Sequence, residues 1–207
     1  KKFKKYNTVA IIGMGGSILG TEAIYYFLQK KIKKKFIFFN NIDEKKLQKF
    51  KKNNKLDKIF FIIVSKSGNT IETISNISAL KIIKKKAKNI IIISEKAQNS
   101  IYEMSKKMEL FHVEHKNYLA GRFSILSEVG MVPAYLMGIN VVRIRKNLLS
   151  HFNKRKKIFL NESSKKLAIL LNTKKIKSLV FFNYIPELNK FLFWCQQLIA
   201  ESLGKNK

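Results

Sequence analysis

Two short segments rich in glycine and hydroxyl groups have the composition of an anion-binding loop. The first, GMGGS at residues 13–17, follows an apolar run and precedes a helix-like segment. The second, SKSGNT at residues 65–70, has the same setting and adds hydroxyl groups and a lysine. Glycines allow a tight turn in which backbone amides approach a ligand, and a helix that begins there presents a partial positive charge. Both segments are therefore expected to bind an anionic group such as phosphate.

The first segment fits neither of the common nucleotide-binding motifs. A dinucleotide fingerprint that begins at Gly13 requires a third glycine where Ile18 stands. A Walker A loop that begins at Gly15 requires a lysine directly after Gly20, where Thr21 stands. Neither segment is accompanied by a feature for adenine or ribose, so a sugar phosphate is the favoured ligand. A glycine-rich turn without a ligand, or hydroxyls that only cap helices, would also explain either segment taken alone.

The elements that must position these loops alternate between strands and helices. Apolar runs predict strands at residues 8–13, 35–40, 59–65, 89–94 and 110–114, and helical spacing fills residues 17–29, 44–52, 70–84 and 99–107. The runs are apolar throughout, which is typical of parallel strands covered on both faces. This order predicts a doubly wound α/β domain over residues 1–140. Its strands would end at one edge of the sheet, so the two loops can converge on one anion.

The last third of the chain has a different pattern. A basic helical stretch at residues 142–173 leads to a further predicted strand, Lys177–Phe182, and a helix, Glu187–Ile199. Residues 141–207 are thus expected to contain connecting helices and the truncated start of a second α/β domain. One strand and one helix cannot complete a sheet, so we expect the chain to be a fragment of a longer parent protein.

Composition argues against several classes of partner. The formal net charge is +29, yet only four of the 42 cationic residues are arginine, and the lysines are scattered along the whole chain. Nucleic acid is therefore not an expected partner, because arginine provides most specific contacts to bases and phosphates. No apolar run approaches the roughly 20 residues that span a membrane. The single cysteine, Cys195, fits a reducing cytoplasm, and the three histidines show no metal-ligand pattern, so no metal is expected.

The order of the motifs resembles a known family. GMGGS followed by SKSGNT resembles the sugar isomerase (SIS) domain of phosphosugar-binding proteins, which has a flavodoxin-like fold of about five strands. Three later segments narrow the resemblance to the glucose-6-phosphate isomerase family: GRFSILSEVGMVPAYLMGIN, NYIPELNKFLFWCQQL and ESLGK, at residues 121–140, 183–198 and 201–205. Together the motifs extend over nearly the whole chain.

This resemblance implies an enzyme that interconverts glucose 6-phosphate and fructose 6-phosphate in glycolysis and gluconeogenesis. The reaction would proceed through a cis-enediol(ate) by proton transfer, without metal or cofactor. By resemblance, Glu201 is the base, Gln197 contacts substrate from one helical turn earlier, and Arg122 stabilises the charge on the enediolate oxygen. The phosphate cradle would be formed by Gly16, Ser17, Ser65, Lys66 through its backbone, Ser67 and Thr70.

The chain departs from the family pattern at two positions. Leu203 stands where an acidic or polar residue is usual in bacterial members, and Asn69 stands where threonine is common. The resemblance also implies a homodimer in which a histidine from the partner subunit opens the sugar ring. That histidine and a catalytic lysine near the C-terminus would lie beyond this chain, so the fragment alone is expected to be incomplete. A non-catalytic phosphosugar sensor and a bifunctional phosphoglucose/phosphomannose isomerase stay open as alternatives.

Overall fold

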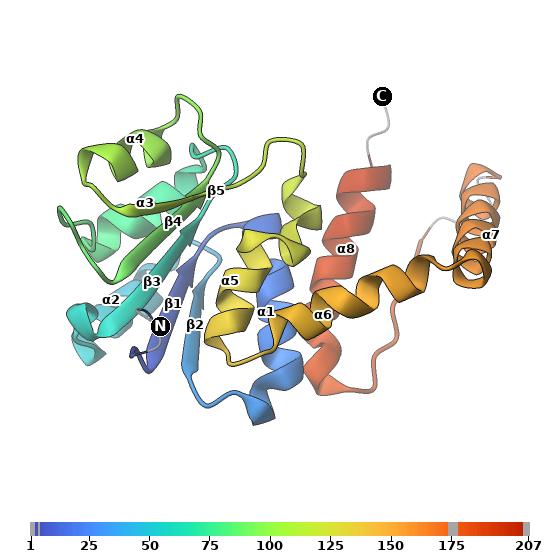
Figure 1. Ribbon diagram of the computed structural model, residues 1–207, viewed down its shortest axis with the longest axis horizontal. Helices are drawn as coiled ribbons and strands as arrows, with labels where there is room; N and C mark the ends of the chain where they lie inside the picture. Colours follow the sequence, from blue (N-terminus) through green and yellow to red (C-terminus); the bar gives the residue numbers. More distant parts are fainter. Residues whose placement is uncertain (1–2, 4, 174–177, 205–207) are drawn as a thin grey trace. The chain divides into compact units, whose positions relative to one another are not determined.

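A parallel sheet forms the centre of the protein (Figure 1). The computed structural model describes residues 3, 5–173 and 178–204. Within them, five strands pair in the order β2-β1-β3-β4-β5, every pair parallel. The strands are β1 (Thr8–Ile12), β2 (Lys35–Phe39), β3 (Ile59–Val64), β4 (Ile90–Ser94) and β5 (Phe111–Glu114). The predicted doubly wound α/β fold is confirmed.

Helices cover both faces of this sheet, which explains its continuous apolar strands (Figure 1). All residues of the central strand β3 are buried. One face packs against α2 (Glu44–Asn53), α3 (Ile71–Leu80) and α4 (Ser100–Lys107). The other packs against α1 (Leu19–Leu28) and α5 (Glu128–Leu136). A strand between two helical layers has no polar face, so its sequence does not alternate.

The order of the strands places two particular loops together. β1 lies between β2 and β3, and the chain leaves β1 for one face of the sheet and β3 for the other. Ile12 at the end of β1 is in register with Ile63 near the end of β3. The loops that follow both strands therefore start at the same level, and ligands of doubly wound folds bind at such a point.

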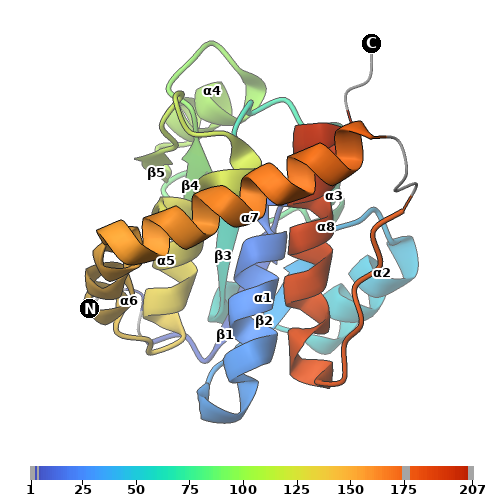
Figure 2. The same ribbon diagram turned by 90° about the vertical axis from the view of Figure 1, so that its right-hand side faces the viewer.

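The helix α8 (Asn189–Leu203) belongs to the same compact unit as the sheet, although it lies at the far end of the sequence. It runs alongside α1 (Figure 2). A 3-10 turn at Pro186–Leu188 leads into it, so the helix begins and ends a few residues later than predicted. This packing brings the ESLGK motif near the first glycine-rich loop; its Lys205 lies outside the described residues.

Residues 140–184 form a second compact unit. It contains α6 (Val141–Leu148), a 3-10 turn at Leu149–Phe152 and α7 (Lys154–Asn172). The prediction of a strand at Lys177–Phe182 is wrong for residues 178–182, which have no strand conformation, and Lys177 lies outside the described residues. A strand requires a neighbour to accept and donate its backbone hydrogen bonds, and this segment has none among the described residues. The proposed second domain at residues 141–207 stays a prediction.

Over the ranges that the structure describes, no helix combines the length and the apolar character needed to cross a membrane.

The buried strand β3 should contribute strongly to the free energy of unfolding. We expect Ile62→Ala, at a side chain that is 0% exposed, to lower the free energy of unfolding by about 3 kcal/mol, because it removes buried methyl groups and leaves a cavity. Ile71→Ala is the control: this side chain is 74% exposed, so its loss should cost less than about 0.5 kcal/mol. Urea unfolding of the full-length parent protein measures both, and equal losses would contradict the packing described.

Candidate active site

The loop after β1 packs directly against the backbone that carries Arg122. Gly15 has a φ of +49°, which favours glycine. A Cβ atom on Gly16 would lie 2.4 Å from the carbonyl carbon of Gly121 and 2.5 Å from the backbone nitrogen of Arg122. Ser124 lies at this contact: its Oγ donates to the Gly121 carbonyl at 2.6 Å and lies 3.3 Å from the Gly16 carbonyl. Glycine at position 16 is therefore required by a close approach of two backbone segments.

The loop after β3 is organised around a buried serine. Ser65 is 1% exposed; its Oγ accepts a hydrogen bond from the Gly68 amide at 3.1 Å and lies 2.8 Å from Thr70 Oγ1. Gly68 has a φ of +67°, and a Cβ there would overlap the Asn99 side chain. The buried hydroxyl of Ser65 thus fixes the conformation of the loop through its contacts with Gly68 and Thr70.

A cavity of about 460 Å³ lies between these loops, the Gly121–Arg122 segment and α8. Every site residue predicted from the sequence except Ser65 lines it: Gly16, Ser17, Lys66, Ser67, Thr70, Arg122, Gln197 and Glu201. Sequence reasoning missed Met14, Gly15, Glu95 and Gly121. Glu95 carried a usable signal, because it is a polar residue directly after a buried strand and so lies at the ligand-binding edge of the sheet.

The carboxylate of Glu201 is held by two donors at the cavity wall. Gln197 Nε2 donates to Glu201 Oε1 at 2.6 Å, and Arg122 Nη1 lies 3.4 Å from Oε2. Arg122 is itself fixed: its Nε donates to Ser202 Oγ at 3.1 Å, and its carbonyl accepts a hydrogen bond from Trp194 Nε1 at 3.0 Å. A carboxylate oriented beside a guanidinium can accept a proton while the cation stabilises a developing negative charge.

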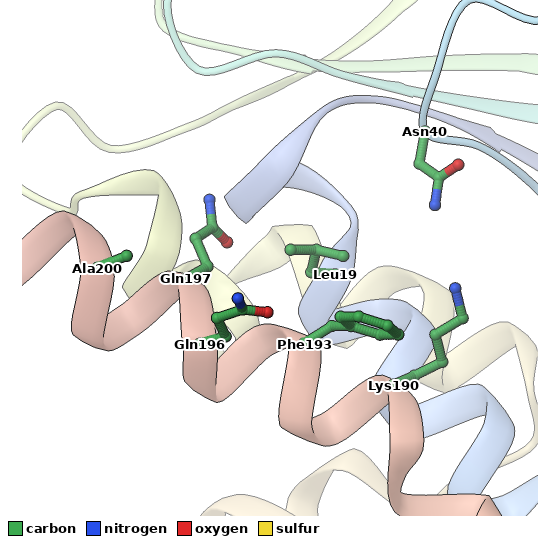
Figure 3. Close-up of a pocket in the computed structure, with 7 residues that line it drawn as sticks. All are labelled: Leu19, Asn40, Lys190, Phe193, Gln196, Gln197 and Ala200. Carbon is green, nitrogen blue, oxygen red and sulfur yellow. The ribbon is translucent and has the colours of Figure 1, made fainter. Parts of the chain in front are cut away.

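A second cavity of about 470 Å³ extends along α8 beside the first (Figure 3). Gln197 lines both cavities. Its Nε2 holds Glu201, and its buried Oε1 has no hydrogen-bond partner in the described part of the chain. Among the described residues that line these cavities, Gln197 is the one common to both.

Lys66, the lysine of the second loop, makes two polar contacts at the cavity. Lys66 Nζ lies 3.4 Å from Glu95 Oε1 and donates to the Asn117 carbonyl at 3.0 Å. Its positive charge is therefore partly neutralised by a neighbouring carboxylate. The hydroxyl-bearing residues Ser67 and Thr70 of the same loop also line the cavity.

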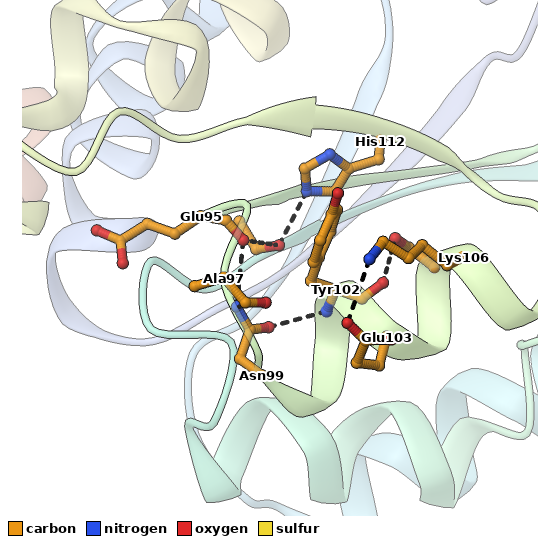
Figure 4. A network of polar contacts seen from close by, with 9 residues as sticks. Glu95, Ala97, Asn99, Tyr102, Glu103, Lys106 and His112 are labelled. Carbon is orange, nitrogen blue, oxygen red and sulfur yellow. Dashed lines mark hydrogen bonds and ion pairs between the residues drawn. The ribbon is translucent and has the colours of Figure 1, made fainter.

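The segment between β4 and α4 supports the second loop (Figure 4). Asn99 caps α4 by accepting a hydrogen bond from the Tyr102 amide at 2.8 Å, and its Nδ2 donates to the Glu95 carbonyl at 3.1 Å. Asn69, one of the departures from the family pattern, accepts a hydrogen bond from the Ser100 amide at 2.9 Å. The asparagine at position 69 thus ties the loop to the start of α4.

Two histidines lie near this edge without lining the cavity. Burial lowers the pKa of His112, whose Nε2 lies 3.0 Å from Ser94 Oγ (Figure 4). Burial also lowers the pKa of His115, and the nearby charge of Lys66 lowers it further. A lowered pKa favours the neutral form of both rings. No three His, Cys, Asp or Glu side chains come together as a metal site in the described ranges.

Comparison with known proteins identifies one family over the whole chain. The family described as phosphoglucose isomerase matches residues 1–207. The chain is 34% identical to a glucose-6-phosphate isomerase of Methanocaldococcus jannaschii, over 100% of this chain and 53% of that protein. It is also 34% identical to one from Borreliella afzelii, over 98% of this chain and 42% of that protein. The chain thus spans about half the length of these relatives.

Solved structures show the same fold. A hypothetical protein from Thermus thermophilus superposes with a TM-score of 0.80 at 23% identity, covering 97% of this chain and 50% of that one. A glucose-6-phosphate isomerase from Chlamydia trachomatis gives a TM-score of 0.53 at 27% identity, covering 65% of this chain and 27% of that one. With a family match over its whole length, this chain belongs to the phosphoglucose isomerase family.

Proposed function

We propose that the parent protein interconverts glucose 6-phosphate and fructose 6-phosphate. The observation that carries this proposal is the arrangement of Glu201, Gln197 and Arg122 on one wall of a cavity whose other wall is the hydroxyl-bearing loop at residues 65–70. The names of the relatives from Methanocaldococcus and Borreliella support the same activity. A pure binding module would need the hydroxyl loop but not an oriented carboxylate.

The phosphate group would anchor the end of the sugar that does not react. Ser67 and Thr70 offer hydroxyls, and the glycine-rich loop offers Ser17 and backbone amides at residues 15–17. An aldose–ketose isomerisation changes only C1 and C2, so binding energy at the phosphate serves to place those carbons. Ser17, Ser67 and Thr70 line the same cavity as Glu201, so one sugar phosphate could contact both groups of residues.

The chemical step would be a proton transfer by Glu201. The carboxylate removes the proton from C2 of the open-chain aldose, giving a cis-enediol(ate), and returns it to C1. Gln197 orients the carboxylate by its 2.6 Å hydrogen bond, and Arg122 lies 3.4 Å away, close to where charge develops on the substrate oxygen. Neither step requires an electron acceptor, because the oxidation of C2 is balanced by the reduction of C1.

Opening the pyranose ring would be the task of a histidine from a partner subunit in a homodimer. The reaction would serve glycolysis and gluconeogenesis, and the protein would act in the cytoplasm. Tolerance of mannose 6-phosphate stays an alternative that a substrate panel would decide.

Replacing the proposed base should lower kcat strongly and leave KM nearly unchanged. In the full-length parent protein we expect Glu201→Gln to lower kcat by about 10²–10⁴-fold, because the amide cannot accept the proton. KM should change by less than about threefold. Glu103→Gln, an exposed carboxylate on α4 that pairs with Lys106, is the matched control and should leave kcat unchanged. A coupled assay from fructose 6-phosphate measures both.

Two results would contradict this assignment. A Glu201→Gln variant that keeps most of its rate would show that another group is the base. A wild-type protein that binds sugar phosphate without turning it over would favour the sensor alternative.

Removing a hydroxyl from the phosphate cradle should raise KM and leave kcat nearly unchanged. We expect Thr70→Val to raise KM by roughly tenfold, since it removes a hydrogen bond to a charged phosphate, worth about 1.5 kcal/mol, while kcat stays within about threefold. Ser78→Ala, on the exposed side of α3, should change neither constant. A loss in kcat at constant KM would instead place Thr70 near the reacting carbons.

A further inference from the structure

A buried carboxylate outside the substrate cavity joins three elements of the fold. Glu22, on the first turn of α1, is 2% exposed. Its Oε1 accepts a hydrogen bond from Asn40 Nδ2 at 2.8 Å, and its Oε2 lies 3.3 Å from Lys190 Nζ. Burial raises the pKa of Glu22, and the charge of Lys190 opposes that rise. The carboxylate thus connects α1, the residue after β2 and the start of α8.

The partner of this carboxylate shares a helix face with the proposed catalytic groups. One side of α8 carries polar side chains at spacings of four, three and four residues: Lys190, Trp194, Gln197 and Glu201. Such spacing places all of them along one stripe of an α-helix. The first two are anchors, because Lys190 pairs with Glu22 and Trp194 bonds to the Arg122 carbonyl. A shift of α8 along its axis would therefore move Gln197 and Glu201 by the same amount.

Apolar packing does not by itself fix the position of α8 along its axis. The cavity of about 470 Å³ lies along the helix, and Figure 3 shows Lys190 and Asn40 extending toward one another beside it. Both are hydrogen-bond donors, and both converge on Glu22. Hydrophobic contacts are non-directional, whereas an ion pair between Lys190 and the buried carboxylate of Glu22 has defined partners and can select one register.

We propose that Glu22 and Lys190 are positioning residues whose ion pair fixes the register of α8 against α1 and so holds Glu201 at the cavity. This inference rests on the proposed function of Glu201. Glu22 follows the glycine-rich loop closely, since its backbone amide donates to the Ile18 carbonyl at 2.9 Å. The same carboxylate therefore relates the position of the base to the position of the first loop.

The test compares Lys190→Met, Glu22→Gln and the double variant in the full-length parent protein. Lys30→Met is the matched control. Lys30, just after α1, pairs with Glu187, just before α8, at 3.0 Å, but the Lys30 side chain is exposed. Each protein is measured for kcat and KM with fructose 6-phosphate, for melting temperature and for the fluorescence of Trp194. A Trp194→Phe variant identifies the emission of that residue.

We expect each single variant to lower kcat by about tenfold or more, to change KM by less than about threefold and to shift the Trp194 emission. The double variant should have a melting temperature close to that of the wild type, because replacing both members of an ion pair leaves no unpaired charge beside the buried position 22. Its kcat should stay low, because the directional contact is still missing. Lys30→Met should match the wild type in every measurement.

Recovery of kcat together with melting temperature in the double variant would show that the pair is only structural and would overturn the inference. Unchanged kcat and Trp194 emission in Lys190→Met would overturn it as well. A wild-type protein without isomerase activity would refute the proposed function instead. The Trp194 emission would then decide the register question: a shift in Lys190→Met supports the inference, and no shift overturns it.

Discussion

The adjacency of β1 and β3 at the centre of the sheet is the constraint on which the site depends. These strands are in register, with Ile12 opposite Ile63, so the loops that follow begin at the same height. The chain then crosses to opposite faces of the sheet, which leaves the space between the two loops uncovered by either helix. The groups that complete the cavity come from segments far along the chain, at residues 121–122 and 197–201.

The two loops keep their shapes by different physical means. The first is held by steric fit, because Gly16 lies against the Gly121–Arg122 backbone with no room for a Cβ. The second is held mainly by side-chain hydrogen bonds: Ser65 Oγ accepts from the Gly68 amide, and Asn69 Oδ1 accepts from the Ser100 amide at the start of α4. A steric constraint tolerates almost no substitution at the glycine, whereas a hydrogen-bonded one can be met by several polar residues. The asparagine at position 69 meets this requirement through its side-chain oxygen.

The sequence predicts the features that local chemistry determines. Continuous apolar runs identified the strands to within about one residue, and the spacing of Gln197 and Glu201 placed both on one helix face. The contribution of Glu95 was missed, because a lone polar residue after a strand has many explanations. The burial of Ser65 was missed because a loop serine gives no sign of which way its hydroxyl points. The strand expected after Lys177 failed because an apolar run has strand conformation only where a neighbouring strand pairs with it.

The charge of the chain and the charge of the cavity have separate consequences. The formal net charge is +29, but each cation that lines the cavity lies next to a carboxylate: Lys66 beside Glu95 and Arg122 beside Glu201. Charges on the distant surface are screened over about 8 Å at physiological ionic strength, so they add little to the affinity of an anion inside. Such charges act mainly on the rate at which an anionic ligand arrives. Under the proposed function, the phosphate would be held by the hydroxyls and backbone amides of two loops, which a parallel sheet places side by side.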